Sequence, residues 1–254
     1  MTIRHVEHVM GTVFSFDVRH EASERITSAI EEAVAWLHHV DALFSTYRPG
    51  SPISRLGRGE IAPEGCPPEI VRVLARCAQV ERDTGGYFTL MPGGRLDPSA
   101  LVKGWAIEHA SALLAVAGAR RHSVNGGGDV RLGASPEPGR PWRVGIAHPL
   151  RPGALAAVVS GTGLAVATSG TAERGHHIVD PHTGAPATAL ASLTLVGYDL
   201  ATVDAYATAA FAMGSAAREW VEEQDELEAF AVTSSGAVWH TSGFQVHAQV
   251  YDAT

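Results

Sequence analysis

The chain has 254 residues, of which 45% are hydrophobic and 18% are charged, a composition typical of a folded domain and not of a disordered chain. This length favours a single domain that spans residues 1–254, or two intimate lobes, and disfavours two independent domains. The formal net charge of -8, without a basic stripe, argues against a nucleic-acid partner. A small anionic ligand is compatible with this charge if positive groups gather locally.

The first residues carry charges and histidines where a secretory signal needs an unbroken apolar segment, and no lipidation cysteine lies among them. No segment has the roughly 18 apolar residues that a membrane span requires. We therefore expect a cytoplasmic protein without a membrane span. Cys66 and Cys77 lack a C-x-x-C spacing, so we expect two free structural thiols.

The first half of the chain predicts one strand and three helices. Residues 10–18 alternate and are rich in Val and Phe, which is typical of a strand. Residues 22–43 place apolar side chains at helical spacing, with Ser23 as the N-cap. A turn-rich loop follows at 44–54, and further helices are predicted at 68–83 and 98–117.

The second half predicts short strands around one long helix, expected at 203–224. The strands are expected at 122–125, 130–132, 142–147, 154–159, 165–168 and 193–198, and the closing ones at 230–232, 238–240 and 245–250. Helices and strands are mixed, with several hairpin-like connections. This order favours an α+β fold over a regular doubly wound one.

Asp204 and Thr208 lie four residues apart in the Ala-rich segment V-D-A-Y-A-T-A. On a helix, residues at this spacing share a face, so the carboxylate and the hydroxyl could act together. The alternative is a surface Asp that complements the helix dipole and a Thr that bonds back to its own helix.

Residues 125–129, N-G-G-G-D, follow a predicted strand. Glycines lack a Cβ, so this backbone could approach a ligand closely and aim N–H groups at an anion. A hairpin turn explains Asn-Gly equally well. Neither a Rossmann nor a Walker motif is present.

Lys103 lies in the first turns of the helix expected at 98–117. A cation is unfavourable there against the helix dipole unless an anion shares the site, which makes Lys103 a candidate phosphate partner. A surface lysine whose stem covers apolar groups is the alternative.

Residues 167–184 combine small residues with charges, histidines and an Asp-Pro turn at Asp180. A zinc site at His176, His177 and His182 is disfavoured, because an adjacent histidine pair is a poor chelate and no H-E-x-x-H spacing occurs. Loop roles are expected for the neighbouring charges Glu173 and Arg174.

Taken together, these segments resemble the ApbE family, the FAD:protein FMN transferases. The resemblance rests on M-G-T at 10–12, F-S-T-Y-R-P-G-S-P-I-S-R-L at 44–56, D-P-S-A-L-V-K-G-W-A-I-E at 97–108, V-N-G-G-G-D-V at 124–130, A-T-S-G at 167–170, H-I-V-D-P-H-T-G at 177–184 and V-D-A-Y-A-T-A at 203–209. Each motif alone is weak, but the ordered set is specific and extends from Met10 to about Gly214.

The resemblance implies an ApbE-like, T-fold-like α+β fold with largely antiparallel sheets, packed helices and two lobes that form a flavin nucleotide cleft. It also implies an enzyme that cleaves FAD at its pyrophosphate, passes FMN to a Ser or Thr hydroxyl of an acceptor flavoprotein and releases AMP. An FAD pyrophosphatase that yields FMN and AMP, and a flavin-binding protein without activity, are the alternatives.

The resemblance further implies a Mg²⁺ ion at Asp204 and Thr208, completed by the carbonyls of Ala100 and Ala207 and a phosphate oxygen. Hard oxygen ligands and shared phosphates suit this ion. His177 is implied as the general base for the acceptor hydroxyl, a task that suits a group with a pKa near neutrality. The implied nucleotide contacts are Met10, Tyr47, Tyr87, Phe88, Thr89, Asp97, Lys103, Gly126, Gly127, Gly128, Asp129 and Ile178.

The chain departs from the family at two points. Where many relatives have G-x-F-D-P, this chain has G-Y-F-T-L-M-P, with Thr89 in place of an acidic residue. The usual export or lipoprotein signal is also absent, which favours a cytoplasmic acceptor over a membrane-bound respiratory subunit.

Overall fold

The computed structural model describes residues 2–172, 175 and 177–251. Its main feature is an eight-stranded sheet in which every pair of neighbouring strands is antiparallel. In spatial order the strands are β1 (Ile3–Val9), β2 (Thr12–Val18), β3 (His122–Gly126), β4 (Asp129–Leu132), β7 (Ala165–Gly170), β8 (Leu190–Gly197), β9 (Glu228–Thr233) and β10 (Val238–His240). The predicted α+β class with largely antiparallel strands is confirmed.

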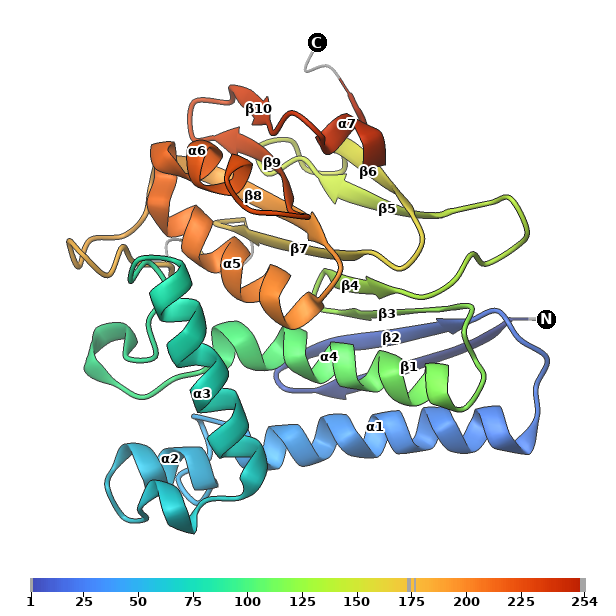
Figure 1. Cartoon of the computed structure of the whole chain (residues 1–254), viewed down its shortest axis with the longest axis horizontal. Helices are drawn as coiled ribbons and strands as arrows, with labels where there is room; N and C mark the ends of the chain where they lie inside the picture. The colour runs from blue at the N-terminus through green and yellow to red at the C-terminus, as the bar shows by residue number, and fades with distance from the viewer. Residues whose placement is uncertain (1, 173–174, 176, 252–254) are drawn as a thin grey trace.

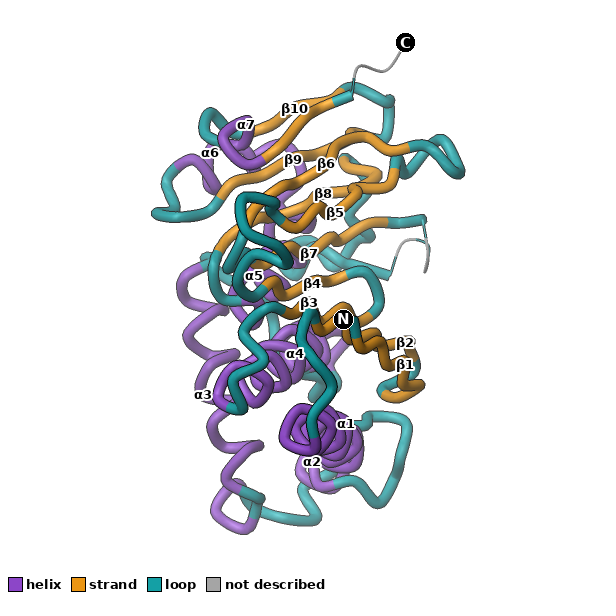
Figure 2. The backbone as a smooth tube through the Cα atoms, turned by 90° about the vertical axis from the view of Figure 1, so that its right-hand side faces the viewer, coloured by secondary structure: helices purple, strands orange, loops and turns teal. Residues whose placement is uncertain are grey.

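Helices cover one face of this sheet and a second, smaller sheet covers part of the other (Figures 1 and 2). The smaller sheet has the order β11 (Ala248–Val250), β6 (Leu155–Gly161), β5 (Trp142–Ala147). The helices are α1 (Glu24–Phe44), α2 (Pro52–Gly57), α3 (Pro68–Asp83), α4 (Ser99–Val116), α5 (Leu200–Met213), α6 (Ala217–Glu222) and α7 (Phe244–His247).

The two faces of the large sheet bury different side chains because successive residues of a strand point to opposite sides. On β7, Ala165 and Ala167 belong to the helix-side core, whereas Val166 belongs to the core between the two sheets. Every residue of β8 is buried, since both of its faces are covered. The small alanines on the helix side leave room for α5 to approach the strands closely.

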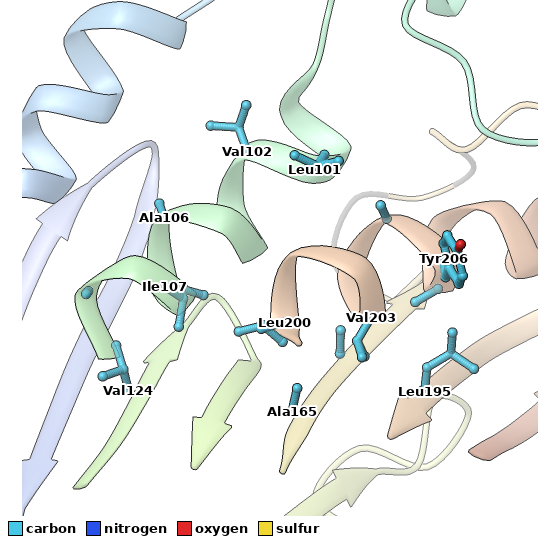
Figure 3. Close-up of a cluster of buried hydrophobic side chains, with 14 of the residues drawn as sticks. Leu101, Val102, Ala106, Ile107, Val124, Ala165, Leu195, Leu200, Val203 and Tyr206 are labelled. Carbon is cyan, nitrogen blue, oxygen red and sulfur yellow. The ribbon is translucent and has the colours of Figure 1, made fainter. Parts of the chain in front are cut away.

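Helices α4 and α5 pack side by side on the sheet, and their contact positions the polar residues described below. Figure 3 shows Ile107 of α4 beside Leu200 of α5, with Val203 directed toward the strands. These three side chains are at most 1% exposed. Two charged residues buried close to this apolar contact are therefore unusual in their surroundings.

Several predicted elements are confirmed with their bounds, including the helix at 68–83 and the strands at 142–147 and 238–240. Ser23 caps α1 as predicted, because its side chain accepts a hydrogen bond from the Ile26 N–H at 3.4 Å. Both cysteines are free, and burial raises the pKa of Cys77 to about 12, which keeps this thiol protonated at neutral pH.

Other predicted bounds are wrong for local reasons. The strand predicted at 10–18 begins at Thr12, because Met10 and Gly11 have positive φ angles of 54° and 69° and form the turn of the β1–β2 hairpin. The helix predicted at 203–224 begins at Leu200 and stops at Met213, since Gly214 has a φ of 60°. The end of the strand predicted at 245–250 is β11, but α7 occupies its beginning.

The turn-rich loop predicted at 44–54 contains the start of α2, for which the Ser51 side chain provides the N-cap. Within the described residues, all helices are too short or too polar to cross a membrane.

Candidate active site

Three charged side chains meet where α4, α5 and the β3–β4 hairpin come together. Asp204 lies in the second turn of α5, Lys103 in the second turn of α4 and Asp129 at the first position of β4. The Lys103 Nζ contacts Asp129 Oδ2 and lies 3.4 Å from Asp204 Oδ1. Asp129 is 1% exposed and Asp204 is 5% exposed. Segments about a hundred residues apart in sequence therefore build one buried charged cluster.

Asp129 reaches this cluster because of the glycines before it. Gly126 pairs with Asp129 across the hairpin, and Gly127 and Gly128 form its turn with φ angles of 59° and 96°, a conformation that favours glycine. The Asn125 side chain accepts a hydrogen bond from the Gly128 N–H at 3.1 Å. The hairpin interpretation of N-G-G-G-D is confirmed, and this hairpin is what delivers the Asp129 carboxylate.

The Asp129 carboxylate is also tied to the neighbouring strand, since its Oδ1 accepts a hydrogen bond from the Thr168 N–H of β7 at 3.0 Å. Apart from its contact with the Lys103 ammonium, its buried Oδ2 has no partner among the described residues. The Lys103 ammonium is the charge that neutralises this oxygen. The alternative of a surface lysine is therefore wrong for Lys103.

Gly104 allows α4 and α5 to approach closely at this point. A Cβ on Gly104 would lie 2.4 Å from the Leu200 carbonyl oxygen and 2.8 Å from the Asp204 Cβ. The Gly104 N–H donates a hydrogen bond to Asp204 Oδ2 at 2.9 Å. In a regular helix this N–H is the donor to the Ala100 carbonyl, so Asp204 competes with Ala100 for it. Sequence reasoning assigned Gly104 no role, although a glycine inside a helical pattern is a recognised signal of close packing.

Glu108 is a second residue whose role sequence reasoning missed. Its carboxylate accepts hydrogen bonds from the Leu200 N–H and from the Arg131 Nε, both at 2.8 Å. Asp199 also caps α5, because its side chain accepts from the Thr202 N–H at 2.8 Å. These bonds fix the first turn of α5 against α4 and β4, and so set the place of Asp204.

Thr208 follows Asp204 by one turn of α5, on the side of β7. Its hydroxyl donates to the Asp204 carbonyl at 3.3 Å and lies 3.4 Å from the Ser169 hydroxyl. Thr208 thus bonds back to its own helix, as the alternative interpretation held for it. The same interpretation is wrong for Asp204, which is buried and not a surface residue.

The predicted metal ligands fit a hard cation better than a soft one. A buried carboxylate, a hydroxyl one turn later and backbone carbonyls are oxygen donors of the kind that Mg²⁺ prefers. The cluster around Asp204 already holds one cationic group, the Lys103 ammonium. Among the residues that the structure describes, no group of three or more His, Cys, Asp or Glu side chains could hold a metal ion. His176, Glu173 and Arg174 lie outside the described residues.

The predicted nucleotide contacts lie mostly on loops and turns. Tyr47 follows α1 and is 95% exposed, whereas the Phe88 side chain is buried in the helix-side core. The Thr89 hydroxyl accepts a hydrogen bond from the Met91 N–H at 3.1 Å. Asp97 precedes α4, and its Oδ1 accepts from the Ser99 N–H at 2.9 Å. Met10 and Ile178 are partly buried against the helix-side core.

One contact joins two of these loops. The rings of Tyr87 and His182 meet edge to face with centroids 4.5 Å apart. Gly86 makes room for this contact, since a Cβ there would lie 3.3 Å from the His182 ring. The loop at 84–98 is thereby placed against the loop that follows β7.

His177 is exposed on the loop after β7, and its Nδ1 lies 3.1 Å from the Gly175 carbonyl oxygen. A carbonyl can only accept, so Nδ1 carries a proton, and in the neutral imidazole Nε2 then has the lone pair. The predicted turn at Asp180 is confirmed, because its carboxylate accepts from the His182 N–H and the Thr183 hydroxyl at 2.9 Å each. These bonds lower the pKa of Asp180, with the bond from the His182 N–H as the largest cause.

The sequence model of the ApbE family matches residues 10–94 and 89–231. An FAD:protein FMN transferase of Rhodobacter capsulatus is 34% identical over 161 residues, which are 59% of this chain and 30% of the relative. An FAD:protein FMN transferase of Klebsiella pneumoniae (strain 342) is 30% identical over 176 residues, 64% of this chain and 50% of the relative. These matches therefore span half or less of the curated relatives.

The fold is similar to that of solved structures over nearly the whole chain. The flavin transferase ApbE from Vibrio cholerae aligns with a TM-score of 0.85 and 20% identity, over 97% of this chain and 99% of that structure. At this identity the similarity concerns the fold.

Proposed function

Since the chain belongs to the ApbE family, we propose that it is an FAD:protein FMN transferase that depends on Mg²⁺. The observation that carries this proposal is the buried cluster of Lys103, Asp129 and Asp204. A fold alone does not specify an activity, whereas a site with defined charges restricts the chemistry. Two carboxylates and one ammonium, close to backbone amides and hydroxyls, suit a phosphate-bearing ligand together with a divalent cation.

Asp204 and Thr208 would hold the metal ion, together with the carbonyls of Ala100 and Ala207. When bound, Mg²⁺ supplies positive charge that stabilises the pyrophosphate oxygens as negative charge develops on them. The bonds of Glu108 to the Leu200 N–H and of Gly104 to Asp204 hold this carboxylate before any ligand arrives. A site fixed in advance needs little reorganisation during the reaction.

Lys103 and the hairpin at 126–129 would line the nucleotide cleft. The Lys103 side chain is 26% exposed, although its ammonium contacts the buried carboxylate of Asp129. Tyr47 and Tyr87 offer aromatic rings for the flavin, together with Met10 and Ile178. The backbone at 87–89 and the side chain of Asp97 complete the proposed set of contacts.

His177 would act as the general base for the acceptor hydroxyl. Its Nδ1 donates to the Gly175 carbonyl, which leaves the lone pair on Nε2 to receive the hydroxyl proton. The acceptor oxygen then bonds to the phosphorus of the FMN half, and the bond from this phosphorus to the AMP half breaks. The products are a Ser or Thr phosphoester of FMN on the acceptor flavoprotein, and AMP. The exposed position of His177 suits a base that must meet a second protein.

The proposal is tested by incubating the full chain with FAD and Mg²⁺, with and without an acceptor flavoprotein domain. The intact mass of the acceptor and the amount of AMP are measured. We expect the acceptor to gain the mass of an FMN phosphoester with stoichiometric AMP. Free FMN and AMP without an acceptor would establish the pyrophosphatase instead, and bound FAD without any product from several acceptors would establish a flavin-binding protein.

A pair of variants connects the activity to the site. Asp204→Asn removes the buried charge at nearly constant volume and is expected to abolish transfer that depends on Mg²⁺. Glu219→Gln makes the same chemical change at an exposed position of α6 and is the matched control, with transfer as in the wild type. Unchanged transfer in Asp204→Asn would contradict the assignment of the metal site.

A further inference from the structure

Lys103 is the single lysine of the chain, and arginines supply all of its other lysine or arginine positive charges. A lysine carries a compact charge on a flexible stem, whereas the planar fork of an arginine holds a carboxylate in a fixed bidentate geometry. The flexible lysine side chain therefore occurs only at the position between two buried carboxylates, Asp129 and Asp204.

The two carboxylates that hold this ammonium differ in burial. The Lys103 Nζ contacts Asp129 Oδ2 and lies 3.4 Å from Asp204 Oδ1, and the side chains of Asp129 and Asp204 are 2% and 7% exposed. Apart from this ammonium, the buried Asp129 Oδ2 has no partner among the described residues, so it depends on Lys103 for its neutralisation. Because Asp204 is the less buried of the two carboxylates, it is the partner that Lys103 can give up more easily.

The second oxygen of Asp204 is already used for the contact between α4 and α5. Asp204 Oδ2 accepts the hydrogen bond of the Gly104 N–H at 2.9 Å, and Oδ1 is the oxygen that faces the ammonium. A metal ion that binds this carboxylate through Oδ1 must therefore take the place of Lys103, because two cations repel each other at such distances.

We propose that Lys103 is an internal counter-cation that competes with the divalent ion for Asp204, and that Asp129 retains Lys103 when the ion binds. This inference rests on the metal site of the proposed function. Without metal, the Lys103 ammonium neutralises part of the negative charge of the two buried carboxylates. With metal, Lys103 turns toward Asp129 and the open side of the cluster, where a phosphate would lie. Lys103 is thus a positioning residue for the metal in addition to its proposed phosphate contact.

The competition predicts opposite effects for two substitutions outside the proposed ligand set. Lys103→Met removes the competing cation and is expected to tighten metal binding about tenfold, within the usual range of coupling between two sites. Asp129→Asn removes the carboxylate that retains Lys103. The ammonium then pairs with Asp204 alone, and metal binding is expected to weaken about tenfold. A merely structural role for these residues would weaken binding in both variants.

The experiment is a calorimetric titration of the full chain with Mn²⁺ in the absence of nucleotide, repeated with Mg²⁺. Asp204→Asn is the reference for loss of the site. Thermal unfolding is followed in EDTA and in Mn²⁺, and the gain in Tm on adding Mn²⁺ is expected to be larger in Lys103→Met than in the wild type. Equal or weaker metal binding in Lys103→Met, or unchanged binding in Asp129→Asn, would overturn the competition.

Folding does not limit the test. If Lys103→Met is unfolded in EDTA, recovery of the folded protein on adding Mn²⁺ supports the inference. If Lys103→Met does not recover, the metal affinity of Asp129→Asn decides, since weaker binding supports the inference and unchanged binding overturns it. Metal binding that depends on Asp204, with wild-type affinity in both variants, rejects the inference and leaves the proposed function standing. Binding with the two opposite shifts, but without flavin transfer to any acceptor, rejects the proposed function and supports the inference.

Discussion

Replacing Gly104 with alanine tests the close contact between α4 and α5, because two physical effects predict opposite signs. Gly104 lies in the interior of α4, where alanine is favoured over glycine by about 1 kcal/mol of helix propensity. From the helix alone, Gly104→Ala would therefore raise the free energy of unfolding.

The packing predicts the reverse. The new Cβ would lie 2.4 Å from the Leu200 carbonyl oxygen, 2.8 Å from the Asp204 Cβ and 3.0 Å from the Leu200 carbonyl carbon. Two of these are backbone atoms, which cannot rotate away as the end of a flexible side chain would. Overpacking of this kind costs about 1–3 kcal/mol, and we take the upper half of that range. The net result is a loss of about 1–2 kcal/mol, or about 2–8 °C in Tm for a chain of this size.

Urea unfolding followed by circular dichroism measures the change, with Ala112→Gly as the matched control. Ala112 is exposed on the same helix, so Ala112→Gly gives the propensity difference without a clash and is expected to cost about 1 kcal/mol. Because the clash includes Asp204, Gly104→Ala is also expected to weaken Mn²⁺ binding, whereas Ala112→Gly is not. An increase in the stability of Gly104→Ala, equal and opposite to the loss in Ala112→Gly, would refute the reasoning.

Three further outcomes are expected. The His122 Nε2 lies 2.7 Å from the Ser111 hydroxyl and its Nδ1 donates to the Ala119 carbonyl at 2.6 Å, while burial lowers the pKa of His122 from 6.5. The unfolded chain then binds more protons than the folded one below about pH 6.5. The free energy of unfolding should therefore decline as the pH falls from about 6.5, and it should decline less steeply in His122→Gln. Urea unfolding at each pH measures both. His177→Ala should lower FMN transfer by about 10²–10⁴-fold with little change in FAD affinity measured by fluorescence, and equal losses in both would make it a binding residue. Gly214→Ala places a Cβ at a positive φ of 60° and 3.0 Å from the Ala189 Cβ, so its Tm should fall, whereas Gly50→Ala, with open space around it, should keep the wild-type Tm.

Much of the fold could be predicted because its signals are local. The helix at 68–83 has apolar residues at helical spacing and glycines after its end, and Ser23 lies one residue before the first turn of α1. Strand β1 was missed, since both of its faces carry polar residues, His5 and Glu7 on one and Arg4 and His8 on the other. Its pairing with β2 is a property of the hairpin and not of the strand itself. The break at Gly214 was missed for a similar reason, because a single glycine in a helical pattern is compatible with both continuation and an end.

The candidate site could be predicted as a set of residues but not as an arrangement. Asp204 and Thr208 were related by helical spacing, whereas no local pattern relates Asp204 to Lys103 or Asp129. Their contact depends on how α4, α5 and the hairpin pack, and on Gly104 and Glu108, which act through backbone atoms of α5. Spacing within one element can be read from sequence, but the distance between elements is a result of tertiary packing.

The surroundings of the cluster indicate why these charges are present. Ile107, Leu200 and Val203 form an apolar contact close to Asp204, and α5 is buried along most of its length. In such a place an ion pair adds little stability, because the desolvation of its charges offsets their attraction, and well-packed apolar residues are often as stable. Packing therefore does not account for Lys103, Asp129 and Asp204. In the proposed function, a ligand that needs a carboxylate to hold a cation, and a cation to meet a phosphate, would account for all three at once.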